Sequence, residues 1–240
     1  KKAIQVLKKI PLNSYLGWNS YLKLADINIS INNYQEAESY ALKLKKFSSD
    51  RVDVYYKLGE IYHNKKEYNQ AIFSFTKAIN LLKKSTEENW YLYYSRGMSY
   101  ERYKKWEKAE KDFLYALKLS PKQPLVLNYL GYTWIDYGIK LKEAESFIKE
   151  AIKLRPKDGY FIDSLGWAYY RQGNYDLAVV ELERAVALVP NDPIINDHLG
   201  DALFRAGYQN EAKYQWNRAL LYEPEKNLRE NIEYKLKKGL

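Results

Sequence analysis

The chain has 240 residues, of which 46% are hydrophobic and 29% are charged, so it can fold into one or two globular domains. Cysteine is absent, which excludes disulfides, thiolate metal sites and thiol nucleophiles. There are two histidines, His63 and His198. The formal net charge is +9, and the excess lies in residues 1–120, with 22 Lys and Arg against 13 Asp and Glu; residues 121–240 carry 17 of each.

A sequence pattern recurs with a period close to 34 residues. In chain order the repeats begin at Trp18, Val52, Trp90, Pro124, Gly159 and Pro193. The eighth residue of each is small, namely Ala25, Gly59, Gly97, Gly131, Gly166 and Gly200. An alanine follows in each repeat, at Ala37, Ala71, Ala109, Ala144, Ala178 and Ala212. Such a period indicates stacked copies of one supersecondary unit.

Each repeat is predicted to contain two amphipathic helices, because apolar residues recur at spacings of three, four and seven. Small residues such as Gly166 and Ala178 are expected where the two helices cross, since larger side chains would separate the backbones. The last four repeats close with a proline, which cannot continue a helix: Pro121, Pro156, Pro190 and Pro224. The predicted fold class is therefore all-α.

The predicted domains follow from this register. Residues 1–17 are expected to be the second helix of an earlier repeat and a loop at Pro11, so we expect the natural protein to extend further toward its N-terminus. The six repeats are assigned to residues 18–51, 52–89, 90–123, 124–158, 159–192 and 193–226, and residues 86–89 are predicted to be an inserted turn. Residues 227–240 are predicted to form a C-terminal capping helix with a polar outer face, as the end of a solenoid requires.

The repeats resemble the tetratricopeptide repeat (TPR) family, whose signature is W-x2-L-G-x2-Y…A-x3-F…P. The third repeat matches it with Tyr93, Gly97, Tyr100, Ala109, Phe113 and Pro121, and the resemblance covers residues 18–226. It implies a right-handed α-solenoid whose first helices line a concave face. It also implies a non-catalytic scaffold or adaptor that binds a peptide or helix of a partner protein in that groove.

The predicted partner-binding residues occupy the inward positions of the first helices that packing does not need. Rigid aromatic side chains and arginines supply much of the binding energy in protein interfaces. A row of such side chains along successive first helices suits an extended peptide or a helix as ligand. The alternative is that tyrosines at helical spacing belong to the core. The predicted set is Tyr56, Tyr91, Tyr94, Arg102, Asn128, Tyr129, Tyr132, Tyr160, Asp163, Trp167, Tyr170, Arg171, Asp197, His198, Phe204 and Arg205.

The charges expected in this groove are of mixed sign, with Lys57, Arg102 and Arg171 among Glu60, Glu101, Asp163 and Asp197. Some TPR proteins clamp a C-terminal carboxylate with Lys, Asn and Arg on successive first helices, and that series is not present here. A mixed groove also lacks the continuous basic track that phosphates need. We therefore expect no carboxylate clamp and no nucleic-acid partner.

Catalysis is not predicted. Asp163, Asp197, His198 and Asp201 fall on adjacent repeats and could form an acid–base group, but no nucleophile or metal partner accompanies them. The phosphate-binding, dinucleotide-binding, zinc-protease and serine-hydrolase motifs are all missing. The sequence predicts neither a cofactor nor a metal.

Two other functions stay open. The chain can be a self-assembling structural module, with a homodimer formed through an apolar end at residues 1–17. Its basic first half, including Lys104 and Lys105, can also contact an anionic surface. We expect membrane contact only through an anchor outside residues 1–240.

The last two repeats, with Leu165-Gly166-Trp167, His198-Leu199-Gly200-Asp201 and Gln215-Trp216, resemble the ends of bacterial TPR proteins, some of them exported or lipid-anchored. This resemblance implies the bacterial periplasm or envelope, with the cytoplasm as the alternative.

Overall fold

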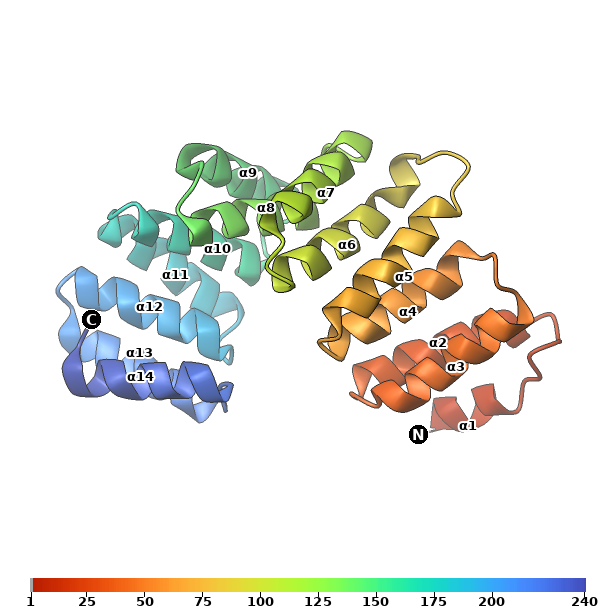
Figure 1. Cartoon of the computed structure of the whole chain (residues 1–240). Coiled ribbons are helices and arrows are strands. Elements are labelled where there is room, and N and C mark those ends of the chain that lie inside the picture. Colours follow the sequence, from red (N-terminus) through yellow and green to blue (C-terminus); the bar gives the residue numbers. More distant parts are fainter. Residues whose placement is uncertain (1) are drawn as a thin grey trace. The chain divides into compact units, whose positions relative to one another are not determined.

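The computed structural model describes residues 2–240, which form fourteen α-helices, one 3-10 turn and no strand (Figure 1). The predicted all-α fold class is confirmed. The chain divides into two compact halves, an N-terminal half that ends at Pro121 and a C-terminal half, Lys122–Leu240. None of the helices among the described residues combines the length and apolar character needed to cross a membrane.

Successive helices form antiparallel pairs within each half. The N-terminal half contains α1 (Lys2–Lys8), α2 (Gly17–Ser30), α3 (Tyr34–Phe47), α4 (Val52–Asn64), α5 (Tyr68–Asn80), the 3-10 turn η1 (Glu87–Asn89), α6 (Trp90–Arg102) and α7 (Trp106–Leu119). The C-terminal half contains α8 (Pro124–Tyr137), α9 (Leu141–Leu154), α10 (Gly159–Arg171), α11 (Tyr175–Leu188), α12 (Pro193–Arg205), α13 (Gln209–Leu221) and α14 (Lys226–Lys238). Each predicted repeat holds one such pair, and η1 lies in the predicted inserted turn.

Small residues bring the two helices of a pair together, as the sequence predicts. A methyl group added at Gly166 would fall 2.5 Å from Cγ of Leu182, and one at Gly200 would fall 2.4 Å from Cδ1 of Trp216. Both distances are well below van der Waals contact, so a side chain at either position would push the paired helices apart.

Each turn inside a pair contains at least one residue with a positive φ. Gly173 and Gly207 adopt φ of 80° and 95° in two of these turns, whereas Asn32, Lys66 and Lys104 adopt 58°, 63° and 57° in others. The left-handed conformation costs an L-residue roughly 1–2 kcal/mol. Packing of the paired helices therefore imposes this turn even where no glycine is available.

Helix α14 closes the C-terminal half. Its Ile232 is fully buried in the same core cluster as Trp216 and Ala219 of α13. The opposite side of α14 carries Glu230, Glu233, Tyr234 and Lys237, all of them exposed. This side is mostly charged, as a capping helix would require, although it also exposes the ring of Tyr234.

Candidate functional site

We define the first-helix face as the surface formed by the first helices of the pairs, and we describe it separately in each half. In the N-terminal half, α4 carries Tyr56, and α6 carries Tyr91, Tyr94 and Arg102. In the C-terminal half the predicted residues lie on three helices: Asn128, Tyr129 and Tyr132 on α8, Tyr160 to Arg171 on α10, and Asp197 to Arg205 on α12.

Aromatic rings of α4 and α6 cluster on the N-terminal half. The rings of Tyr56 and Tyr91 meet edge to face with centroids 4.7 Å apart, and Trp90, which sequence reasoning did not assign to the site, lies 5.8 Å from Tyr94. Tyr94 is half-buried, and burial raises the pKa of its phenol to about 12. Tyr91 is half-buried, and its pKa is raised by burial and by the carboxylates of Asp53 and Glu60. Tyr91 is thus the tyrosine of this cluster best placed to meet a partner.

The charges beside this cluster are engaged within the chain. Lys57 forms ion pairs with both Asp26 and Glu60. Burial works against its ammonium, but Glu60 and Asp26 outweigh burial and raise the pKa of Lys57. Arg102, whose side chain is 59% exposed, has Glu101 Oε2 3.4 Å from its Nε.

In the C-terminal half, Trp167 lies between two other rings. Its indole stacks on Tyr170 with centroids 4.7 Å apart and on the His198 imidazole at 4.1 Å, with interplanar angles of 11° and 15°. These two rings cover part of the indole, and its Nε1 is buried, so little of Trp167 is left to meet a partner. The sequence predicted Trp167 as a contact residue but could not show that its faces are engaged.

His198 is bound to the preceding first helix. Its Nδ1 lies 2.9 Å from Oδ1 of Asp163, and both side chains are buried. Burial disfavours the imidazolium, but the Asp163 carboxylate outweighs burial and raises the pKa of His198. The pair therefore links α10 to α12 through a charged hydrogen bond.

Lys235 of α14 completes a buried network and was missed by the sequence reasoning. Its Nζ lies 2.9 Å from both carboxylate oxygens of Asp197 and 2.7 and 2.8 Å from those of Asp201. Asp201 also accepts a 2.9 Å hydrogen bond from Nε1 of Trp216. A signal for Lys235 was available, because it lies 34 residues after Asp201, one full repeat later.

Three predicted contact residues must be reassigned. Asp163, Asp197 and His198 are 6%, 5% and 7% exposed, because His198 covers Asp163 and Lys235 covers Asp197. The sequence placed them on a partner-binding surface, whereas the structure places them in the interior. The structure does bring together the acidic residues and histidine once considered for acid–base chemistry, but as ion pairs and hydrogen bonds between helices. Among residues 2–240, no group of three or more His, Asp or Glu side chains is placed to hold a metal ion.

Other predicted residues of the C-terminal half stay accessible. Tyr160 is 56% exposed and Arg205 is exposed, while Tyr170 and Phe204 are half-buried. Arg171 is exposed and donates a 3.1 Å hydrogen bond to the main-chain oxygen of Asp136. Asn128, Tyr129 and Tyr132 on α8 are all half-buried.

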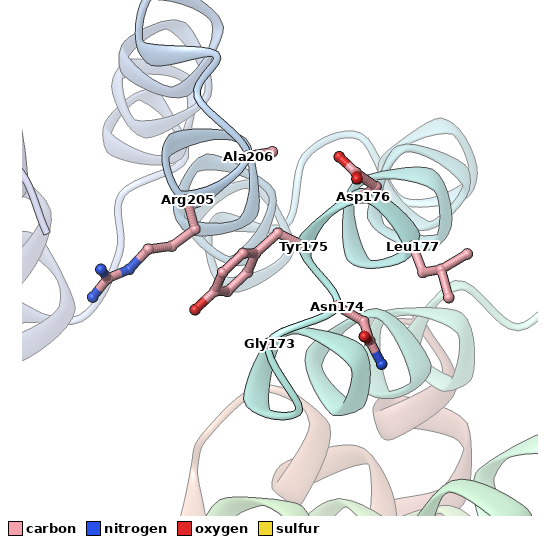
Figure 2. Close-up of a pocket in the computed structure, with 7 residues that line it drawn as sticks. All are labelled: Gly173, Asn174, Tyr175, Asp176, Leu177, Arg205 and Ala206. Carbon is pink, nitrogen blue, oxygen red and sulfur yellow. The ribbon is translucent and has the colours of Figure 1, made fainter.

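A shallow cavity of about 390 Å³ lies beside Arg205. It is lined by the turn between α10 and α11, Gly173 to Leu177, together with Arg205 and Ala206 (Figure 2). Figure 2 shows the Tyr175 hydroxyl and the Arg205 guanidinium on one side, with the Asp176 carboxylate away from them.

The helix pairs in register and the face that their first helices form define a helical-repeat protein of the α-solenoid class. Tetratricopeptide repeat profiles match residues 52–81 and 90–123, and a TPR repeat profile matches residues 166–207. The chain is a tetratricopeptide repeat protein. Proteins of this family generally bind other proteins, and the family and fold are typically non-catalytic.

Known proteins resemble this chain in sequence and in structure. TPR repeat-containing protein PA4667 of Pseudomonas aeruginosa is 41% identical over 59 residues, which are 25% of this chain and 10% of the relative. One chain in the crystal structure of the APC/C hetero-tetramer Cut9–Hcn1 superposes on all of this chain with a TM-score of 0.84 at 19% identity. The match spans 46% of the Cut9–Hcn1 chain. A Parabacteroides merdae TPR protein gives 0.73 at 17% identity over 98% of this chain and 88% of its own. The structural matches establish the fold.

Proposed function

We propose that this protein is a non-catalytic adaptor that binds a peptide or helix of a partner protein on its first-helix face. The observation that carries the proposal is the exposure of Tyr160, a large aromatic side chain on α10 that the fold leaves 56% accessible. Tyr170 and Arg205 lie on the first-helix face of the same half, and Tyr91 lies on that of the other half. Tyrosine and arginine give large contact area and hydrogen bonds at low entropic cost, which makes them frequent anchors of interfaces.

Photo-cross-linking tests this proposal with a matched control. A photoreactive phenylalanine replaces Tyr160 in one variant and Tyr214 of α13 in another, since Tyr214 is 62% exposed but lies on a second helix. We expect a partner from the source cells to cross-link at position 160 and not at position 214. Tyr160→Ala should weaken retention of that partner by more than about fivefold, the loss expected for an interface anchor. Equal cross-linking at both positions, or at 214 alone, would contradict the proposal.

Self-assembly is the second candidate function. Val6 of α1 and Tyr15 and Leu16 of the following loop are exposed apolar or aromatic side chains close together in the sequence. Sedimentation velocity over a hundredfold range of concentration tests it. A dimer that Leu16→Asp dissociates would favour assembly, whereas a monomer throughout would argue against it.

Two further expectations are carried forward as proposals. A location in the bacterial envelope is supported by the resemblance of the last two repeats, and fractionation of the source cells tests it. Contact with an anionic surface is supported by the exposed Lys104, Lys105 and Lys108. Sedimentation with phosphatidylserine vesicles at increasing salt tests that contact.

A further inference from the structure

The charges that the C-terminal half offers to a partner differ from the charges in its sequence. Residues 121–240 carry equal numbers of acidic and basic residues. Three of the carboxylates on α10 and α12, those of Asp163, Asp197 and Asp201, are only 5–6% exposed. Inside the fold they bind His198 and Lys235. These acidic side chains, which gave the predicted groove its negative charges, are thus not available to a ligand.

The cations at one end of the same face stay accessible. Arg205 is the last residue of α12 and is exposed, and the neighbouring Tyr170 hydroxyl is the main group that raises the pKa of its guanidinium. Lys238 is exposed at the end of α14. The two helix ends are adjacent, because a methyl group added at Gly239 would fall 2.8 Å from Cζ of Phe204.

The surface around these two cations is hollowed. The cavity of about 390 Å³ lies on one side of Arg205. A second cavity, of about 620 Å³, is lined by Lys238 with Asn231, Tyr234, Lys235, Gly239 and Leu240. Arg171, at the end of α10, adds a third cation, although Oδ1 of Asp136 lies 3.7 Å from its Nη1. We call Arg171, Arg205 and Lys238 the basic edge.

We propose that the basic edge recognises an acidic peptide segment, whose carboxylates pair with Arg205 and Lys238 while its apolar side chains contact Tyr170 and Phe204. This inference rests on the proposed function, because it names the class of peptide that the first-helix face of the C-terminal half takes. Charge complementarity carries it: within residues 2–240, Arg205 and Lys238 form no ion pair with a carboxylate, whereas the buried carboxylates are bound by His198 and Lys235. Arginine is suited to the task, since its planar guanidinium can bind a carboxylate through two parallel hydrogen bonds.

Selection from a randomised nine-residue peptide library displayed on phage tests the inference. The library is selected on the immobilised full chain, on the Arg205→Gln/Lys238→Gln variant and on the control variant Arg184→Gln/Lys213→Gln. The control removes the same formal charge from second helices, α11 and α13. Circular dichroism first establishes that all three proteins are equally helical.

We expect the full chain and the control to select peptides enriched in Asp and Glu. Removal of each cation should lower the affinity for the tightest-binding peptide up to about fivefold, the usual strength of an exposed ion pair. This difference in affinity should shrink at high salt. Replacing Glu by Gln in the peptide should cause a similar loss.

Every other outcome overturns the inference. If neutral or basic peptides are selected, peptide binding stands and the acidic class is wrong. If acidic peptides bind both variants equally, the site is elsewhere. If no peptide is selected, the acidic-peptide inference fails, and cross-linking at position 160 decides separately whether the proposed function survives.

Discussion

Replacing Lys235 with methionine should release α14 from the C-terminal half. Methionine keeps most of the length and apolar stem of lysine but removes the ammonium that lies within 2.9 Å of four carboxylate oxygens. Asp197 and Asp201 are then left side by side without a cation. Burial and the Asp201 carboxylate already raise the pKa of Asp197, which shows how unfavourable this arrangement is.

The magnitude follows from the burial of the three side chains, which are 5–6% exposed. Breaking a buried ion pair by removing one partner typically costs about 3–5 kcal/mol. A terminal helix can avoid this cost by detaching, because water then solvates the two carboxylates. Detachment exposes Ile232, whose burial stabilises the docked helix by about 1.5–3 kcal/mol. Since the two energies are comparable, the variant should lose α14 locally before the remaining helices unfold.

Hydrogen exchange followed by mass spectrometry measures the opening of α14 directly. We expect protection of residues 226–238 to fall at least about a hundredfold in Lys235→Met, because each 1.4 kcal/mol is a factor of ten. Lys237→Met, at a neighbouring exposed position, is the control and should change stability by less than about 0.5 kcal/mol.

A second variant separates the charge from the packing. Adding Asp197→Asn and Asp201→Asn to Lys235→Met removes both uncompensated charges, and the amide oxygen at position 201 can still accept from Trp216. Protection of α14 should then recover in part. Unchanged protection in Lys235→Met would refute the reasoning, and so would a failure of the triple variant to recover.

Three further predictions concern the remaining contacts. The raised pKa of His198 implies that the stability it contributes is complete below about pH 6.5, the usual value for histidine, and is lost as the pH rises through the folded value. Hydrogen exchange of α12 from pH 6.5 to 9 should show this loss, and His198→Gln should abolish it. Gly200→Ala should destabilise the protein by about 1–3 kcal/mol in urea unfolding, because the new methyl group meets the buried Trp216 ring; an unchanged midpoint would contradict this. Arg96 binds Asp112 through two nitrogens, Nε at 2.7 Å and Nη2 at 2.8 Å, and the single nitrogen of a lysine does not reproduce this pair of parallel hydrogen bonds. Arg96→Lys should therefore cost about 1–3 kcal/mol in the same assay, and a change below 0.5 kcal/mol would count against the argument.

The histidine prediction has an internal control of opposite sign. Burial and the charge of Arg102 lower the pKa of His63 below its usual value. His63 therefore affects the stability of the protein only under acidic conditions. Below about pH 6.5 the unfolded chain binds a proton at His63 more readily than the folded chain does, so stability falls as the pH falls. Loss of stability above that pH is then assigned to His198, and the His198→Gln comparison confirms the assignment.

The repeat pattern was sufficient to predict the fold, because each repeat is a local unit. A small residue such as Gly166 and its partner Leu182 are 16 positions apart, so the crossing of the two helices is encoded within one repeat. Four turns are exceptions, since Asn32, Lys66, Lys104 and Lys140 take a left-handed conformation that their side chains disfavour. There the packing of neighbouring helices decides the local geometry.

Which side chains the repeat leaves accessible was decided by the tertiary structure. The period placed Asp197, His198 and Arg205 on one predicted face, because residues with the same helical phase are equivalent in sequence. Only packing between neighbouring first helices separates them: His198 binds Asp163, and α14 brings Lys235 onto Asp197, while Arg205 stays exposed. Whether a residue is buried or paired with a charge depends on which side chain of the neighbouring helix packs against it. The position of a residue within its own repeat does not specify that side chain. The sequence thus determines that the chain is a stack of helix pairs with a tyrosine-rich first-helix face, and the structure determines which charges on that face can meet a partner.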